Sequence, residues 1–192
     1  RHGDHFSRSI FDLEESRGNV TYVLSDDIWT RQVPEDLLGR TIFLGPGEEV
    51  SLKDGAGNPV DIRAFKSTDQ GVAFLASLEG RTIYHAGDLN WWHWEGEPAS
   101  WNRNMETGFR REIDSIAGER FDAAFVPLDP RLEAAYGLGM DYFLQKTSAT
   151  HVFPMHMWEE YGYISKYKET QTGRQHAAQI VDISRRGEEF ML

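Results

Sequence analysis

The sequence predicts a mixed α/β fold in which two β-sheets pack face to face and helices cover the outside. Two observations support this prediction. Short strand-like segments, separated by turn signals such as Asp54-Gly55 and Glu79-Gly80, dominate the first half of the chain. Helix-like and strand-like segments alternate in the second half, which favours a layered sandwich over a doubly wound parallel sheet.

The first half is expected to begin with an amphipathic helix and to continue mainly as strands. Phe6, Ile10 and Leu13 recur at helical spacing, so residues 6–16 are expected to be helical and to end before Gly18. Ser25 or Asp26 would cap a brief helical turn. The last four expected strands follow one another closely and predict a meander. The expected strands are Val20–Leu24, Thr41–Leu44, Val50–Leu52, Val60–Phe65, Val72–Leu78 and Arg81–His85.

The second half is expected to alternate between helices and short buried strands. A continuous apolar run of four to eight residues is typical of a strand that is buried on both faces. A closing pair of strands is expected around the Arg186-Gly187 turn. The expected helices are Asn102–Ile116, Leu132–Lys146 and Glu159–Thr170, and the expected strands are Ala123–Val126, His151–Phe153, Ala178–Ile183 and Glu188–Met191.

Composition excludes several classes of protein. The chain has 192 residues, 31 of them acidic and 20 basic, and its net charge is −11. Its apolar runs are shorter than the roughly 20 residues that a membrane span requires. The acidic charge repels phosphate backbones, so no nucleic-acid polymer is expected as a partner. The chain has no cysteine, so a metal site must use His, Asp or Glu, and a cytoplasmic location is weakly favoured.

Three clusters of ligand-type residues stand at the ends of expected elements. His2, Asp4 and His5 precede the first helix, Asp88 follows one strand, and His156 follows a later one. Each has a structural alternative when taken singly: a helix N-cap, a Gly-Asp turn and a hydrogen-bonded histidine. Together they predict a metal site, because metal ligands converge from separate elements.

This combination resembles the metallo-β-lactamase superfamily. The usual first motif of the family is His-x-His-x-Asp-His, and His2, Asp4 and His5 match its last three ligand positions. Asp88 matches the bridging aspartate and His156 the last histidine. The phrase Ile83-Tyr84-His85-Ala86-Gly87-Asp88 looks like the lactonase-like branch. The resemblance implies one domain over residues 1–192, folded as a four-layer αββα sandwich whose first strands lie upstream of Arg1.

The resemblance also implies a function. It indicates a metal-dependent hydrolase with one or two divalent ions, with Zn²⁺ expected and Mn²⁺ or Fe as alternatives. A metal-bound hydroxide would attack a small ester, lactone or phosphoester. Asp88 would hold this nucleophile and Asp4 would relay its proton, so these two residues are the expected catalytic groups.

One ligand of the family is missing from this sequence. The family usually carries a further histidine at the end of the preceding strand, where this chain has Phe65-Lys66-Ser67-Thr68-Asp69. Either Asp69 or Ser67 replaces it as a harder ligand, which would favour Mn²⁺ or Fe, or a single ion does the work. Alternatively, Ser67–Gln70 is only a turn. The missing histidine leaves a degenerate, non-catalytic metal-binding scaffold open. A phosphodiesterase or nuclease acting on small nucleotides, which would share the metal cluster, also stays open.

Three residues are candidates for contact with a small-molecule substrate. Arg131 would bind an anionic group through its planar fork of donors, or instead pair with Asp129 or Glu133. Trp91 and Trp92 follow Asp88 directly and would wall a pocket, or instead cover the edge of the sandwich or an oligomer contact. A homo-oligomer therefore stays open, whereas no membrane partner is expected.

Overall fold

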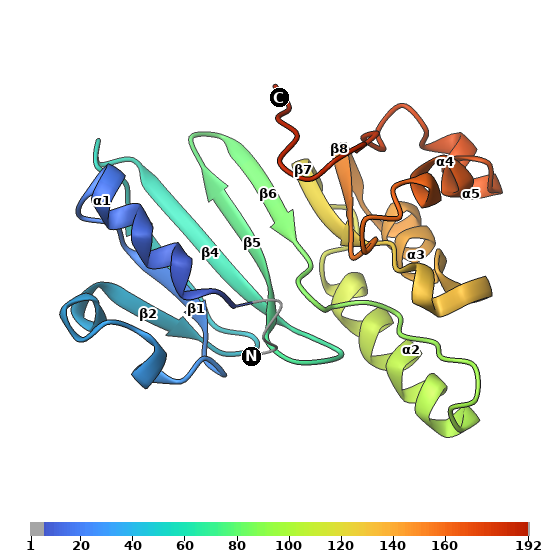
Figure 1. Cartoon of the computed structure of the whole chain (residues 1–192), viewed down its shortest axis with the longest axis horizontal. Coiled ribbons are helices and arrows are strands. Elements are labelled where there is room, and N and C mark those ends of the chain that lie inside the picture. Colours follow the sequence, from blue (N-terminus) through green and yellow to red (C-terminus); the bar gives the residue numbers. More distant parts are fainter. Residues whose placement is uncertain (1–5, 192) are drawn as a thin grey trace.

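Residues 6–191 are described by a computed structural model of the chain, so the predicted ligands His2, Asp4 and His5 lie outside the described residues. The described chain contains a two-stranded and a six-stranded sheet (Figure 1). The small sheet pairs β1 (Tyr22–Ser25) with β2 (Thr41–Leu44). The large sheet has the order β3 (Glu49–Lys53), β4 (Pro59–Lys66), β5 (Val72–Leu78), β6 (Arg81–His85), β7 (Arg120–Pro127) and β8 (Ser148–Met155).

The strand pairing in the large sheet changes from antiparallel to parallel at β6. Strands β3 to β6 are consecutive and antiparallel, which confirms the predicted meander. Strands β6, β7 and β8 are parallel, and the connections between them run through α2 (Ala99–Ser115) and α3 (Leu138–Lys146). Parallel neighbours bring their carboxyl ends to the same edge of a sheet. The predicted ligands Asp88 and His156 follow two of these three strands.

Three apolar cores separate four layers. Tyr22 and Leu24 on one face of β1 pack against Phe11 of the 3₁₀-helix η1 (Arg8–Asp12). Val23 on the opposite face of β1 packs with residues of β4 and β5, as the alternation of strand side chains requires. The third core fills the space between the large sheet and α2 and α3. The layers are therefore helix, sheet, sheet and helix, which confirms the predicted layered α/β sandwich.

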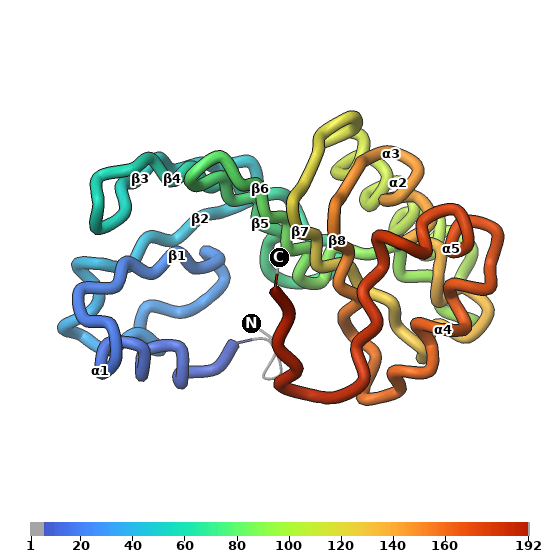
Figure 2. The backbone as a smooth tube through the Cα atoms, turned by 90° about the horizontal axis from the view of Figure 1, so that it is seen from above, coloured from blue at the N-terminus to red at the C-terminus, as the bar shows by residue number. Residues whose placement is uncertain are grey.

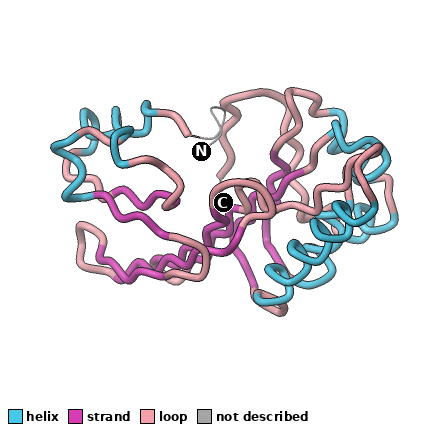
Figure 3. Tube along the Cα trace, turned by 90° about the horizontal axis from the view of Figure 1, so that it is seen from below, coloured by secondary structure: helices cyan, strands magenta, loops and turns pink. Residues whose placement is uncertain are grey.

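Figures 2 and 3 show this arrangement along the sheets. The N-terminal elements lie on one side of the large sheet, and α2 and α3 lie on the other (Figure 2). The strands run between the outer groups of helices (Figure 3). The segment that follows β8 returns to the side of the N-terminal elements, where it passes β7 and β8.

The large core is built around stacked aromatic rings. Tyr84 of β6 stacks on Phe143 of α3 at 5.3 Å between ring centroids, and Phe143 stacks on Phe121 of β7 at 5.9 Å. From α2, Phe109 and Ile113 enter the same core, one helical turn apart. This packing fixes α2 and α3 against the strands whose ends carry the predicted site.

The N-terminal layer is held by a polar contact as well as by its core. Glu14 lies in α1 (Leu13–Arg17), and its carboxylate accepts two hydrogen bonds of 2.9 Å from the guanidinium of Arg40. It also accepts from the backbone N–H of Val20 at 2.9 Å. These contacts tie the first helical segment to the start of β2.

Two sequence-based expectations are wrong. Leu132–Lys146 is not one helix. It is divided between η4 (Pro130–Ala135), which is kinked at Glu133 with a φ of 51°, and α3, which begins only at Leu138. Ala178–Ile183 and Glu188–Met191 form no strand pair. Ile180 makes only an isolated bridge to Val152, and the apolar residues of the tail pack on the sheet instead of entering its ladder.

The remaining differences concern the limits of elements and short helices. The helix expected over residues 6–16 is η1 followed by α1, and the one expected over 159–170 is shorter. Among the described residues, no helix has the length and apolar character needed to cross a membrane. The other short helices are η2 (Thr30–Gln32), η3 (Glu35–Arg40), α4 (Gly162–Lys168) and α5 (Gln171–Gln175).

Candidate metal centre

Three ionisable side chains meet at the carboxyl edge of the parallel strands. Asp88 follows β6, Asp129 follows β7 and His156 follows β8. His156 Nε2 lies 2.9 Å from Asp88 Oδ1, and His156 Nδ1 lies 3.4 Å from Asp129 Oδ2. The Asp129 side chain is fully buried, that of Asp88 is 5% exposed and that of His156 is 12% exposed. The imidazole therefore joins two buried carboxylates.

The electrostatics of this group favour a positive charge between the carboxylates. Burial acts to lower the pKa of His156, but contacts with Asp129 and Asp88 outweigh it and raise the pKa to about 9. Burial acts to raise the pKa of Asp129, but hydrogen bonds with His156 and Arg131 hold it at about 2. Protonated His156 and the guanidinium of Arg131 thus supply the positive charge that the two buried carboxylates require.

The backbone is strained where it presents one of these side chains. His156 has a φ of 65°, and Trp158 and Glu159 just beyond it also have left-handed φ values. Such a conformation is uncommon for residues other than glycine and costs about 1–3 kcal/mol each. Gly87, before Asp88, has a φ of 54°, and a Cβ there would lie 3.0 Å from the carbonyl oxygen of Val72. The backbone is therefore strained on the His156 side of the contact, whereas on the Asp88 side a glycine adopts the positive φ without strain and leaves room for the carbonyl of Val72.

The loop that carries Asp88 is held by hydrogen bonds from its neighbours. Trp92 Nε1 donates to the backbone oxygen of Asp88 at 3.0 Å. Thr68 Oγ1 donates to the Asn90 carbonyl at 2.7 Å and accepts from the Asn90 N–H at 3.1 Å. Asn90 is 1% exposed and packs against Gly139 of α3, where a Cβ would lie only 2.0 Å from Asn90 Oδ1. The site thus depends on a glycine in a distant helix.

The three predicted substrate residues occupy different places. Trp92 packs edge-on against His156, with ring centroids 5.7 Å apart. Trp91 instead packs on Phe109 and Tyr142, on the side of α2 and α3, and these contacts give its predicted substrate role no support. Arg131 forms the ion pair that was its alternative, since its Nη2 lies 2.5 Å from Asp129 Oδ2.

The guanidinium of Arg131 also contacts two aromatic rings. Its Cζ lies 4.6 Å from the centre of the Trp158 ring and 5.6 Å from that of Trp94. An arginine held by a buried carboxylate and by two ring faces is fixed in orientation. Arg131 therefore fixes Asp129, which in turn contacts His156.

Asp69, the predicted replacement for the missing histidine, lies in the loop between β4 and β5 at the same edge as Asp88. Its backbone N–H donates to Ser67 Oγ at 3.1 Å, and Ser67 is buried whereas Asp69 is exposed. The β4–β5 loop is joined to the Asp88 loop through Thr68. The role of Asp69 as a ligand stays a prediction.

The donor set suits a divalent ion, although the described residues do not complete one. Two ligands on one tetrahedral Zn²⁺, each at about 2.0–2.2 Å, lie about 3.3–3.6 Å apart. The Asp88–His156 pair, at 2.9 Å, is a direct ion pair that would open slightly to admit an ion. Within residues 6–191, no three His, Asp or Glu side chains form a group that would hold a metal ion. The predicted site therefore requires the ligands at positions 2, 4 and 5.

Asp129 is the residue that the sequence reasoning did not assign to the site. It appeared there only as a partner for Arg131. The sequence did carry a signal for this role: Asp129 directly follows the apolar segment Phe125–Leu128, as Asp88 and His156 follow their strands. Carboxylates that orient a metal-binding histidine through its second ring nitrogen are common.

A cavity of about 560 Å³ adjoins the site. Asp88, Gly87 and His85 line part of it. The rest is lined mainly by apolar residues of β1, β5 and the N-terminal helices, with polar residues such as Asp27 and Gln70 among them. Phe6, the first described residue, also lines this cavity. The predicted ligands His2, Asp4 and His5 thus directly precede, in sequence, a residue that lines the same cavity as Asp88.

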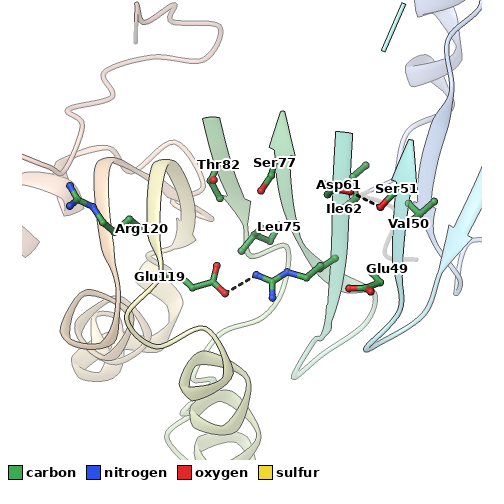
Figure 4. Close-up of a pocket in the computed structure, with 11 residues that line it drawn as sticks. Glu49, Val50, Ser51, Asp61, Ile62, Leu75, Ser77, Thr82, Glu119 and Arg120 are labelled. Carbon is green, nitrogen blue, oxygen red and sulfur yellow. Dashed lines mark hydrogen bonds and ion pairs between the residues drawn. The ribbon is translucent and has the colours of Figure 1, made fainter. Parts of the chain in front are cut away.

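A second, polar cavity of about 310 Å³ lies on the opposite face of the sheet (Figure 4). Its charged groups are largely paired with one another. Arg63 binds Glu119 at 2.7 Å, and Ser51 Oγ donates to Asp61 at 2.5 Å. These pairs satisfy the polar surface, and we assign this cavity no function.

No protein-family model matches the chain, and no curated protein sequence matches it significantly. Several solved structures are similar in part. CmlA, a diiron β-hydroxylase from Streptomyces venezuelae, is 11% identical over 73% of this chain and 31% of its own, with a TM-score of 0.41. Zn²⁺-bound PqqB from Methylobacterium extorquens is 9% identical over 75% of this chain and 50% of its own, with a TM-score of 0.34.

A candidate Zn-dependent hydrolase of the metallo-β-lactamase superfamily, from Thermotoga maritima, is also similar. It is 16% identical over 61% of this chain and 50% of its own, with a TM-score of 0.28. The chain thus spans from about a third to a half of the length of these three proteins. At these scores the likeness assigns neither a family nor an activity.

The contact between Gly139 and Asn90 predicts a long-range effect on stability. Gly139→Ala should lower the free energy of unfolding by about 1–3 kcal/mol, because the new methyl group overlaps Asn90 Oδ1. Urea denaturation measures this change. Gly162→Ala is the matched control, because a Cβ at this helix position meets no atom within 4 Å, and its effect should stay within about 1 kcal/mol. Equal stability of the two variants would contradict the packing described for the Asp88 loop.

Proposed function

We propose that this protein is a metal-dependent hydrolase of the metallo-β-lactamase superfamily, similar to its lactonase-like branch. One observation carries the proposal: Asp88 and His156, which match two ligand positions of the family motif, meet at 2.9 Å although 67 residues separate them in sequence (156 − 88 − 1). A motif resemblance alone would not require this contact. The position of Phe6 in the same cavity as Asp88 supports His2, Asp4 and His5 as the remaining ligands.

Two residues at this edge would bind the ion, and two others would position them. His156 would bind the ion through Nε2, because its Nδ1 faces Asp129. Asp88 would bind the ion through its carboxylate, and its backbone is fixed by Trp92 and the Thr68 loop. Asp129 would orient the ring of His156 without binding the ion, and Arg131 would hold Asp129.

The ion supplies the reactive chemistry when it is bound: it polarises a substrate oxygen and lowers the pKa of a coordinated water towards neutrality. The carboxylates of Asp88 and Asp4 are then the groups that would hold and transfer a proton near the substrate. The ring of Trp92 lies against His156 and would exclude bulk water from this side of the site.

The adjoining cavity suits a small substrate. Its volume of about 560 Å³ falls in the usual range for small-molecule sites, and its lining is mainly apolar. An ester, lactone or phosphoester with an apolar body would place that body in the cavity and its reacting group at Asp88. The net charge of −11 argues against a polymeric nucleic acid as the substrate.

Activity of the natural full-length protein tests this function. Protein loaded with Zn²⁺ or Mn²⁺ should hydrolyse generic esters, lactones or phosphodiesters and should lose activity on chelation. Loss of a residue that merely orients a ligand costs about 10–100-fold, so Asp88→Asn and His156→Ala should each lower kcat/KM by at least about 100-fold. His151→Gln, a change of another histidine on β8, is the control and should alter kcat/KM by less than about twofold.

Two outcomes would contradict the proposal. Hydrolysis that persists in Asp88→Asn would place the chemistry elsewhere. Tightly bound metal together with no hydrolysis of any of these substrate classes would favour the non-catalytic scaffold.

The absence of the family's further histidine leads to a separate prediction about metal content. If Asp69 replaces it, elemental analysis should find two ions per chain in the full-length protein and about one in Asp69→Ala. Asp61→Ala is the matched control, because Asp61 lies on the same strand–loop unit but lines the polar cavity on the opposite face. An unchanged metal content in Asp69→Ala would exclude Asp69 as a ligand and leave Ser67–Gln70 as a turn.

A further inference from the structure

Four aromatic rings form a ladder across the parallel strands, on the face that points away from α2 and α3. His85 of β6 pairs in register with Phe125 of β7, and Phe125 pairs with Phe153 of β8. Their rings stack at 5.5 and 4.9 Å between centroids. Phe190 of the C-terminal segment continues the ladder, edge-on to Phe153 at 5.5 Å.

This ladder is distinct from the large core. The neighbours Tyr84 and Ala124 point into the core beneath α2 and α3, so His85 and Phe125 point to the opposite face. The chain segment after β8 runs on that face (Figures 2 and 3). Between this segment and the sheet lies a cavity of about 430 Å³, lined by Phe125, Phe153 and Phe190 together with Arg185, Arg186 and Glu188.

Positive charge lies at this aromatic cavity, although the chain as a whole is strongly acidic. Arg185 and Arg186 are consecutive, exposed and part of its lining. The carboxylate of Glu188 also lines it, but accepts from the N–H and hydroxyl of Ser184 at 2.7 and 3.0 Å and is attracted by Arg185. Arg186 has no ion-pair partner among the residues from 6 to 191.

The ladder connects this cavity to the candidate metal centre. His85 forms its first rung and also lines the cavity that Asp88 lines. At the other side, Met155 lines the aromatic cavity and directly precedes His156. The two cavities share no lining residue, but the adjacent rungs His85 and Phe125 line one cavity each.

We infer that the aromatic cavity binds an anionic aromatic molecule, with its ring system against the edges of Phe125 and Phe153 and its carboxylate or phosphate at Arg185 and Arg186. His85 and Phe153 already cover the two faces of Phe125, so the ring of the ligand would meet the ladder edge to face, an arrangement that aromatic rings favour. A guanidinium pairs with planar oxyanions through a fork of donors. That such a molecule is the substrate rests on the proposed hydrolase function. The binding itself requires neither metal nor catalysis.

Isothermal titration of the full-length protein with two isosteric ligands tests this inference. 2-Naphthoate is the anionic probe and 2-naphthamide the neutral one, both in the presence of a chelator so that no metal contributes. The double variant Arg185→Gln/Arg186→Gln should weaken naphthoate binding about fivefold and leave naphthamide binding unchanged, because an exposed charge pair contributes about 1 kcal/mol at most. Phe153→Leu should weaken both ligands.

Arg103→Gln/Arg174→Gln is the control, since it removes the same charge from exposed positions on α2 and α5. It should leave both affinities unchanged. Equal weakening of the two ligands by Arg185→Gln/Arg186→Gln would overturn the assignment of the anion to these arginines. No binding of either ligand by the wild type would mean that polypeptide closes the cavity in solution, and would overturn the inference entirely.

These results are independent of the hydrolase test. Loss of hydrolysis in Asp88→Asn with intact naphthoate binding would support both proposals. Binding without any hydrolysis by the metal-loaded wild type would preserve the ligand site and reject the function.

Discussion

The parallel pairing of β6, β7 and β8 is the constraint on which the candidate site depends. It brings the carboxyl ends of three strands to one edge and places Asp88, Asp129 and His156 there together. Two buried carboxylates are costly unless a positive charge lies between them. This electrostatic requirement raises the pKa of His156 and lowers the pKa of Asp129. A proton on His156, together with the guanidinium of Arg131, satisfies it.

Much of the surrounding structure keeps this edge in place. The left-handed backbone at His156 is a conformation that an unconstrained chain would avoid, and the turn at Gly87 needs a residue without a Cβ. Thr68, Trp92 and Gly139 come from three different parts of the chain and fix the Asp88 loop. The N-terminal layer, tied down by Glu14 and Arg40, brings Phe6 into the cavity beside Asp88. Residues from several layers of the sandwich therefore hold the Asp88–His156 edge in place.

The sequence predicted the elements whose signals are local. The bounds of β2, β5 and β6 agree with the expected strands, because turn residues limit them on both sides. The meeting of Asp88 and His156 followed from their positions after strands. The break at Glu133 was not predictable, because a left-handed residue inside a helical pattern leaves no mark in periodicity. Asp129 escaped notice because an Asp-Pro-Arg turn is common, and its importance comes only from the tertiary approach of His156.

Anomalous diffraction from crystals of the full-length protein grown with Zn²⁺ tests most directly whether Asp88 and His156 bind one metal ion together. We expect an anomalous peak about 2.0–2.2 Å from both His156 Nε2 and the Asp88 carboxylate, with Asp129 on the other nitrogen of the ring. A structure in excess Zn²⁺ that shows no peak at this edge and keeps the direct Asp88–His156 contact would contradict it.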